Sequence, residues 1–265
     1  MEISGLRLNI TIGEHEVYRA PRWWIDSQRS FPLGRAGVIL PDPERDLYKS
    51  IKRGDAVEIT CGYRDRDPAV WRGSVLYCGP GETKDQIEVS AVDGSLPLAA
   101  IRVTQSWENE TPEAIIKWAV NKAGLTIGRI DAPGIVLPRF IASNIPVWQV
   151  ARQAAHSCQA AFEIDMSRWA FWLGASGVNW GDFDEVGEAP VITTGDGLIS
   201  HSPAEGPAAL SMIETFLLPE LTHSRQVHLQ DNWRGIDERF RALRVKHEGT
   251  PDTARTFIWY GTESE

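Results

Sequence analysis

Four carboxylates close to a tryptophan are the residues of this sequence best suited, by type and spacing, to chemistry. Trp180 is followed by Asp182, Asp184, Glu185 and Glu188. Paired carboxylates beside an aromatic platform for a sugar ring are typical of glycoside hydrolases. Catalytic carboxylates, however, need raised or split pKa values in a packed pocket, and a glycine-rich polar loop keeps its carboxylates hydrated. We therefore expect a solvated acidic loop between domains, with glycoside hydrolysis as the less favoured interpretation.

Metal binding and other catalytic motifs find less support. Oxygen ligands of the acidic loop suit Ca²⁺, but their spacing matches no EF-hand. His15 and His247 each precede a glutamate, yet neither is followed by the second histidine of an HExxH zinc motif. We expect His247 to be a structural residue of a strand or turn. P-loop, dinucleotide and nucleophile-elbow motifs are missing too. The sequence therefore predicts no catalytic residue, no metal site, no cofactor and no enzymatic activity.

Charge and composition exclude further classes of protein. The formal net charge is -9 over 265 residues, whereas a surface that binds duplex DNA needs clustered basic residues. No apolar run approaches the roughly 18 residues of a membrane-spanning helix, and the acidic start MEISGLRLNI does not match a signal peptide. Cysteines at 61, 78 and 158 have no metal-ligand spacing and predict reduced thiols. We expect neither sequence-specific nucleic-acid binding nor membrane insertion.

Eleven tryptophans are many for a chain of this length. Large aromatic side chains dominate protein cores and subunit interfaces, which is the use we favour here. A sugar-binding platform is the alternative. The surrounding patterns place several of them on strands (Trp23, Trp24, Trp169 and Trp172) and two on helices (Trp118 and Trp148).

The first third of the chain reads as short strands joined by turns. Residues 54–63 alternate, with Val57, Ile59 and Cys61 on one face, which is the period of a half-buried strand. Further strands are expected over 6–12, 70–78 and 86–93, one or two strands over 23–38 broken at 32–34, and a helical turn over 44–51. Three consecutive strands with short loops favour an antiparallel meander within a barrel or sandwich. We place this first barrel domain at residues 1–104.

The middle of the chain departs from the all-β pattern. Thr111, Pro112 and Gly124 occupy the N-cap, the first helical position and the position beyond the end of a predicted helix. A second helix begins at Pro146 and has a narrow, alanine-rich face. A strand at residues 162–165 and the segment 169–173 then predict a hairpin. We expect a small α+β domain over residues 105–175.

The last third returns to alternating strands. After a polar loop over 176–190, a strand with a turn is expected over 191–200. Further strands are expected on both sides of Pro219-Glu220 and in a closing hairpin over 241–261. We place a second β-barrel domain at residues 176–265.

Several of these segments, in this order, resemble a known family. They are GDAVEITCGY (54–63), VWRGSV (70–75), IEVSAVDG (87–94), TPEAIIKWAVNKAGL (111–125), LLPEL (217–221) and VKHEG (245–249). The pattern is similar to that of phage tail baseplate hub proteins of the late control protein D family. These belong to Mu-like and related contractile tails and are relatives of the head domain of type VI secretion spike proteins. The resemblance covers most of the chain, and its motifs are fold patterns, none of which is a chemical site.

The resemblance implies both a fold and a role. The fold would be mainly β within the α+β class: two antiparallel tube-type barrels flank a small α+β middle domain. The role would be structural, in a phage or prophage virion tail. Three subunits form a homotrimeric ring of pseudo-sixfold symmetry that joins the tail tube to the central spike. The implied partners are the tail tube protein, the central spike protein and baseplate wedge proteins, with synthesis and assembly in the bacterial host cytoplasm.

Apolar strand positions near the barrel ends are the candidates for assembly contacts. We single out Trp71, Val75, Phe216 and Leu218, which could equally belong to the barrel cores. The chain is shorter than many hubs, which argues against direct spike attachment by its own tail. Two alternatives stay open: a tail component that binds or degrades cell-wall polysaccharide, and a spike-type subunit, against which the missing β-helical needle region argues.

Overall fold

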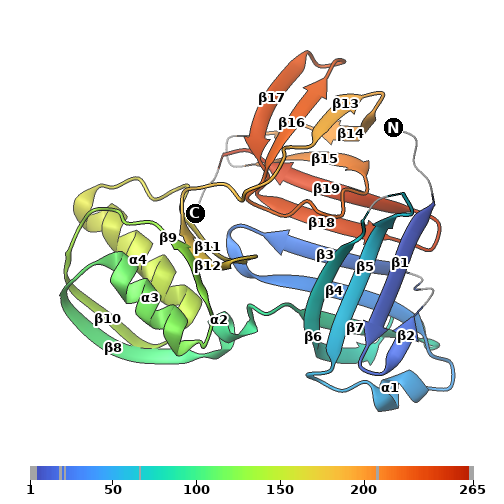
Figure 1. Cartoon of the computed structure of the whole chain (residues 1–265), viewed down its shortest axis with the longest axis horizontal. Coiled ribbons are helices and arrows are strands. Elements are labelled where there is room, and N and C mark those ends of the chain that lie inside the picture. Colours follow the sequence, from blue (N-terminus) through green and yellow to red (C-terminus); the bar gives the residue numbers. More distant parts are fainter. Residues whose placement is uncertain (1–4, 18–19, 21, 66, 207–208, 263–265) are drawn as a thin grey trace. The chain divides into compact units, whose positions relative to one another are not determined.

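The computed structural model describes residues 5–17, 20, 22–65, 67–206 and 209–262. Strands predominate and the longer helices are confined to one part of the chain (Figure 1), which confirms the predicted mainly β member of the α+β class. The chain divides into two compact units. The sheet unit comprises Met1–Ser27, Gly34–Gly94 and Val186–Thr262. The helical unit comprises Gln28–Leu33 and Ser95–Glu185. The predicted division into three domains, 1–104, 105–175 and 176–265, stays a prediction.

The sheet unit is built on one 14-stranded sheet, in the order β17-β16-β13-β14-β15-β19-β18-β3-β4-β7-β6-β5-β1-β2. The first third of the chain contributes β1 (Leu6–Ile12), β2 (His15–Val17), β3 (Arg22–Gln28), β4 (Phe31–Pro41), β5 (Ala56–Tyr63), β6 (Ala69–Pro80) and β7 (Gln86–Val92), with the short helix α1 (Asp46–Ser50). The last third contributes β13 (Val191–Thr194), β14 (Gly197–Ser202), β15 (Ser211–Phe216), β16 (Gln226–Asp231), β17 (Ile236–Arg241), β18 (Arg244–Gly249) and β19 (Ala254–Tyr260).

The predicted meander is confirmed at β5, β6 and β7, which pair antiparallel in that sequence. Val57, Ile59 and Cys61 are all buried on one face of β5, as their alternation predicts. Across the pair, Ile59 faces Trp71. The register shifts between Val75 and Tyr77, so that Leu76 forms a bulge, a device that increases the local twist of a sheet.

The first and last thirds meet where β3 pairs with β18. The last third also contributes to the core of the first, because Leu217 and Ala254 belong to the same buried cluster as Ile10, Trp23 and Ile59. A second cluster, around Ile213, Val227 and Ile258, fills the space between the strands of the last third. Among the described residues the strand order is open from β17 to β2, and no closed barrel is found.

The helical unit packs two helices against short sheets. Its elements are α2 (Leu96–Ala100), β8 (Arg102–Glu110), α3 (Pro112–Lys122), β9 (Ile127–Ile130), β10 (Leu137–Pro146), α4 (Val147–Phe162), β11 (Ala170–Gly174) and β12 (Gly177–Gly181). β8 pairs with β10, and β12 lies between β11 and β9. The predicted caps of α3 are present: the Thr111 hydroxyl accepts the Ala114 N–H at 3.4 Å, and Gly124 has φ +70°.

Local predictions failed at two turns. The predicted break at residues 32–34 lies inside β4, and the chain instead turns between Gln28 and Phe31. The predicted strand at 162–165 does not form, because α4 continues to Phe162 and ends at Glu163 in the left-handed conformation. β11 consequently pairs with β12. β12 lies in a stretch that the glycines led us to predict as a loop.

The glycines of β12 have a steric reason. A Cβ on Gly177 would lie 2.5 Å from the Thr126 carbonyl oxygen, and one on Gly181 would lie 2.5 Å from Asp131 Oδ2. Gly177 therefore excludes a side chain, because backbone atoms approach it closely, whereas a Cβ on Gly181 would force the Asp131 side chain to shift. All five residues of β12 are buried. Across the described ranges, none of the helices combines the length and apolar character needed to cross a membrane.

Candidate functional site

The acidic run after β12 is not a catalytic pocket with a sugar platform. Trp180 is only 1% exposed, and its ring packs edge-on against Trp169 at a centroid distance of 4.6 Å in the core of the helical unit. An indole that is buried in a core cannot stack on a sugar ring. The hydrolase interpretation thereby loses its aromatic platform.

The carboxylates of this run also differ from the predicted solvated loop. Glu185 accepts hydrogen bonds from Trp172 Nε1 at 2.7 Å and from Asn179 Nδ2 at 3.2 Å, and Asp182 forms an ion pair with Arg168 at 3.2 Å. Glu185 therefore ties its segment to β11 and β12, while Glu188 is exposed. Within the part of the chain that is described, no three or more His, Cys, Asp or Glu side chains gather as metal ligands would.

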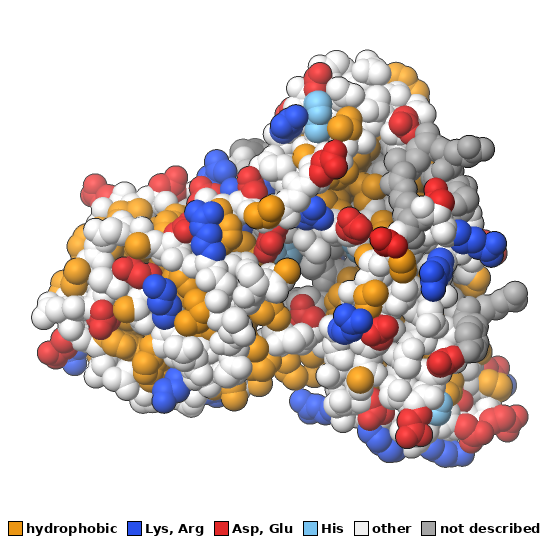
Figure 2. All heavy atoms as spheres, in the orientation of Figure 1, with side chains coloured by type: hydrophobic (Ala, Val, Ile, Leu, Met, Phe, Trp, Pro, Cys, Tyr) orange, Lys and Arg blue, Asp and Glu red, His pale blue; other side chains and the backbone are white. Residues whose placement is uncertain are grey.

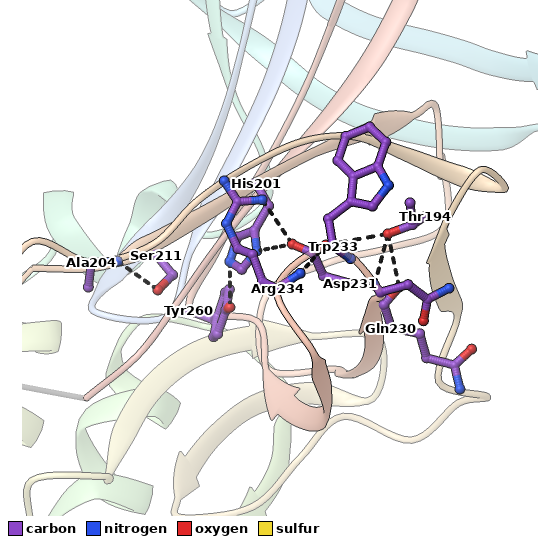
Figure 3. A network of polar contacts seen from close by, with 10 residues as sticks. Thr194, His201, Ala204, Ser211, Gln230, Asp231, Trp233, Arg234 and Tyr260 are labelled. Atoms are coloured by element: carbon purple, nitrogen blue, oxygen red, sulfur yellow. Dashed lines mark hydrogen bonds and ion pairs between the residues drawn. The ribbon is translucent and has the colours of Figure 1, made fainter.

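A buried polar network in the last third of the chain brings several titratable groups together (Figure 3). Asp231, at the end of β16, is completely buried. His201 Nδ1 lies 2.9 Å from Asp231 Oδ2, and His201 Nε2 lies 2.9 Å from the Tyr260 hydroxyl. Because a carboxylate only accepts, His201 donates to it through Nδ1. The network thus joins β14, β16 and β19.

Asp231 also shapes the turn between β16 and β17. Its Oδ1 accepts the backbone N–H groups of Trp233 at 3.1 Å and Arg234 at 3.4 Å. Oδ2 additionally accepts Arg234 Nη1 at 3.0 Å, and the Thr194 hydroxyl lies 3.4 Å from Oδ1. Hydrogen bonds to the ionised form, first from His201 and then from Arg234, lower the pKa of Asp231 to about 2. The carboxylate is therefore charged at neutral pH.

The network positions groups and supplies no reactive one. Burial raises the pKa of Tyr260 to about 12, so its phenol stays protonated and is a poor nucleophile near neutral pH. An aspartate-histidine pair activates a nucleophile only when a serine, cysteine or threonine is in reach of the histidine, and here the second imidazole nitrogen faces Tyr260. What the arrangement does is hold the β16–β17 turn.

The β16–β17 turn carries an exposed tryptophan, Trp233. Trp233 is 85% exposed although its own backbone N–H is fixed by Asp231, and in Figure 3 its indole projects from the turn. Sequence reasoning missed this turn. Its signal was present, because Asp231, Asn232 and Gly235 separate two alternating segments, and Asp, Asn and Gly are the residues that favour tight turns.

His247 is structural, as predicted. It is buried on β18, with Nε2 donating to the Leu221 carbonyl and Nδ1 lying 2.9 Å from the Thr256 hydroxyl. The carbonyl can only accept, so Nδ1 is the acceptor of a neutral imidazole. Burial lowers the pKa of His247 to about 4, because desolvation disfavours the charged ring.

Because His247 has a lowered pKa, we expect the folded chain to lose stability in mild acid. Between pH 6.5, the ordinary pKa of the unfolded state, and about pH 4, the unfolded chain binds a proton that the folded chain does not. The free energy of unfolding should therefore fall as the pH drops through that window, by up to roughly 3 kcal/mol. Urea unfolding at a series of pH values measures it. His247→Gln, which does not titrate, should flatten this slope; an unchanged slope would assign it to other groups.

The four predicted assembly residues lie in different environments. Val75 is 2% exposed within the core of the first third. Trp71 is half-buried and packs against that core, and Leu218 packs in the same way against the core of the last third. Phe216 is half-buried beneath Arg255, whose guanidinium carbon lies 5.4 Å from the ring centroid. On the face drawn in Figure 2, acidic and basic side chains are interspersed.

Comparison of the sequence with family models and with curated proteins finds no match. Comparison of the structure finds solved proteins of the same fold. A 43 kDa tail protein of prophage MuSo2 from Shewanella oneidensis aligns with a TM-score of 0.70 at 11% identity, over 98% of this chain and 97% of that chain. A tail protein from Neisseria meningitidis aligns with a TM-score of 0.68 at 13% identity, over 97% and 96%.

A third solved structure links the fold to secretion. It is an E. coli component of the type VI secretion system that is described as structurally similar to bacteriophage T4 tail proteins; it aligns with a TM-score of 0.63 at 11% identity, over 98% of this chain and 77% of that one. Identities this low establish a shared fold only. At that level the resemblance to tail proteins is confirmed: the whole chain has the fold of prophage tail proteins.

Proposed function

We propose that this chain is a non-enzymatic structural subunit of a phage or prophage tail. Within the tail, we propose that it is a subunit of the baseplate hub. The observation that carries the proposal is the extent of the structural match, which takes in nearly the whole of this chain and of two prophage tail proteins. A match of that extent supports a structural role for the chain, because both matched proteins are described as tail proteins.

The proposed mechanism is geometric. Each subunit contributes two similar barrel-like halves, one from each end of the chain. Three subunits then present six such halves to the tail tube on one side and a threefold ring to the central spike on the other. Contacts between unlike surfaces of neighbouring subunits close into a ring when their rotation allows it. The proposed partners are two further copies of the chain, the tail tube protein, the central spike protein and baseplate wedge proteins, in the baseplate of the virion.

The joined sheet supports this role. Because β3 and β18 pair and Leu217 and Ala254 enter the first core, the two halves share a sheet and a core within one subunit. A subunit that presents both halves together is what the proposed pseudo-sixfold ring requires. The alternative of a cell-wall polysaccharide enzyme has lost its platform at Trp180, which is buried.

The solution mass of the purified chain tests the ring. We expect a discrete species near three times the chain mass of 29.5 kDa in light scattering over a concentration series. Phe216→Ala should yield a folded protein of lower mass if Phe216 lies at the interface. Val75→Ala, at a position with almost no exposed surface, should instead lower the free energy of unfolding by roughly 1–3 kcal/mol.

A wild-type chain that stays monomeric at every concentration would contradict the ring formed by the chain alone. Retention on cell-wall polysaccharide in a pull-down, together with a monomeric mass, would favour a sugar-binding tail component.

A further inference from the structure

The β16–β17 turn has the features of a binding contact that is ordered in advance. Trp233 is 85% exposed, and Asp231 fixes the turn through the backbone N–H groups of Trp233 and Arg234. The Arg234 side chain is itself partly exposed. Tryptophan and arginine are the residues that most often carry the binding energy of protein interfaces. A turn that is already ordered loses little conformational entropy when it binds.

Charge is segregated along the last third of the chain, and this bears on the partner. Residues 225–244, which include β16, the turn and β17, contain five arginines and three acidic residues. One of those three, Asp231, is buried. Residues 186–206 and 209–224, which include β13, β14 and β15 and which we call the acidic segment, contain no Lys or Arg but five acidic residues: Glu188, Asp196, Glu205, Glu214 and Glu220.

The acidic segment also exposes large apolar side chains. They are Val186, Val191, Ile199 and Leu210. A segment that exposes apolar side chains and carries carboxylates but no Lys or Arg suits a partner that offers an indole and a guanidinium together. The high exposure of Trp233 means that the indole does not cover these groups within its own chain. In Figure 2, hydrophobic and charged side chains lie together over the part that Figure 1 labels β13, β16 and β17.

We propose that the β16–β17 turn of one copy, through Trp233 and Arg234, docks on the acidic segment (186–206 and 209–224) of a second copy. The occupant is a second copy because this chain carries both complementary surfaces. The two surfaces differ, so the contact is head-to-tail and can repeat from copy to copy until a ring closes. This inference rests on the proposed ring and names the contact that would close it.

The first experiment compares Trp233→Ala with the wild type by light scattering over a concentration series. Trp233→Ala should raise the concentration needed for half-assembly by at least about tenfold. At a concentration at which both proteins are monomeric, its thermal unfolding should stay that of the wild type, because the hydrogen bond to Asp231 comes from the backbone N–H of Trp233 and survives the change. The matched control is Tyr77→Ala, which removes another exposed aromatic side chain of the sheet unit, outside residues 186–244, and should assemble as the wild type does.

A mixing experiment tests the head-to-tail geometry. A chain carrying Glu188→Arg and Asp196→Arg, both at exposed positions, loses the acidic surface but keeps the turn. At the concentration at which the wild type is half-assembled, this variant and Trp233→Ala should each stay largely monomeric when measured alone. Mixed in equal amounts, they retain one intact contact per pair and should form a 1:1 dimer that grows no further.

The outcomes separate this contact from the ring itself. If Trp233→Ala assembles like the wild type, the docking contact is wrong and the hub ring stands. If the wild type is monomeric throughout, both are wrong. If Trp233→Ala changes only retention on cell-wall polysaccharide and leaves the mass unchanged, the exposed indole serves sugar binding and the docking contact is wrong.

Discussion

Replacing Asp231 with Ala is expected to lower the free energy of unfolding of the chain by about 3–5 kcal/mol. The side chain is completely buried and serves His201, Arg234 and the turn backbone at once. Its removal leaves the His201 Nδ1–H group buried without an acceptor, which costs the full desolvation of that group. Urea unfolding followed by tryptophan fluorescence measures the loss.

The matched control for this prediction is Asp237→Ala. Asp237 also pairs with a histidine, with His228 Nε2 lying 2.5 Å from Asp237 Oδ1, but its side chain is largely exposed. Exposed ion pairs contribute about 0–1 kcal/mol, so this variant should unfold nearly as the wild type does. A loss below about 1 kcal/mol for Asp231→Ala would mean that water replaces the carboxylate and that the network does not hold the turn.

A double variant distinguishes the Asp231–His201 interaction from the separate contributions of the two side chains. Replacing Asp231 and His201 together with leucine removes both polar groups and leaves neither partner of that bond unpaired. Buried ion pairs replaced by apolar side chains of similar size are often neutral, so the double variant should be more stable than Asp231→Ala alone. Additive losses would show that the two side chains do not interact energetically.

Replacing Arg29 with Ala is expected to destabilise the helical unit by about 3 kcal/mol. Arg29 is 3% exposed and donates to the carbonyl oxygens of Arg168 at 2.9 Å and Gly181 at 3.1 Å. Its guanidinium carbon also lies 4.7 Å from the centroid of the Trp172 ring. The truncation leaves buried carbonyl groups without their donors and leaves a cavity beside the indole.

Arg129→Ala is the control for Arg29. Arg129 also stacks on an aromatic ring, with its guanidinium carbon 4.1 Å from the Phe183 centroid, but 62% of its side chain is exposed. Its loss should cost less than about 1 kcal/mol. Arg29→Lys should recover only part of the stability, because an ammonium group cannot reproduce the planar fork of donors. Equal losses for Arg29→Ala and Arg129→Ala would contradict a special role for burial.

Local patterns predicted most of the strands of the sheet unit and both long helices. β1 coincides with the predicted residues 6–12, and the alternation in β5 identified its buried face. Thr111 and Gly124 marked the ends of α3 because a cap is satisfied within a few residues of the chain. β2, β8, β12 and β17 were not predicted. In β12, the glycines that suggested a loop instead stand where Thr126 and Asp131 approach closely.

The candidate site was missed for a related reason. The carboxylates after Trp180 were the candidate site because they lie close together in the sequence. The buried network around Asp231 instead takes its members from strands that are distant in the sequence. His201 lies 30 residues from Asp231 and 59 from Tyr260. No spacing rule connects such positions. The turn at Asp231 was visible as turn chemistry, but the burial that fixes it was not.

By itself the sequence determined the class of the fold, the strand alternation, the helix ends and the resemblance to tail hub proteins. These are properties of neighbouring residues or of the order of segments along the chain. The tertiary structure alone decided that β3 pairs with β18, that Trp180 is core while Trp233 is exposed, and that Arg29 reaches Gly181, 152 residues away. Burial and pairing depend on groups that folding brings together. The type of a residue therefore does not reveal whether its side chain is buried or exposed.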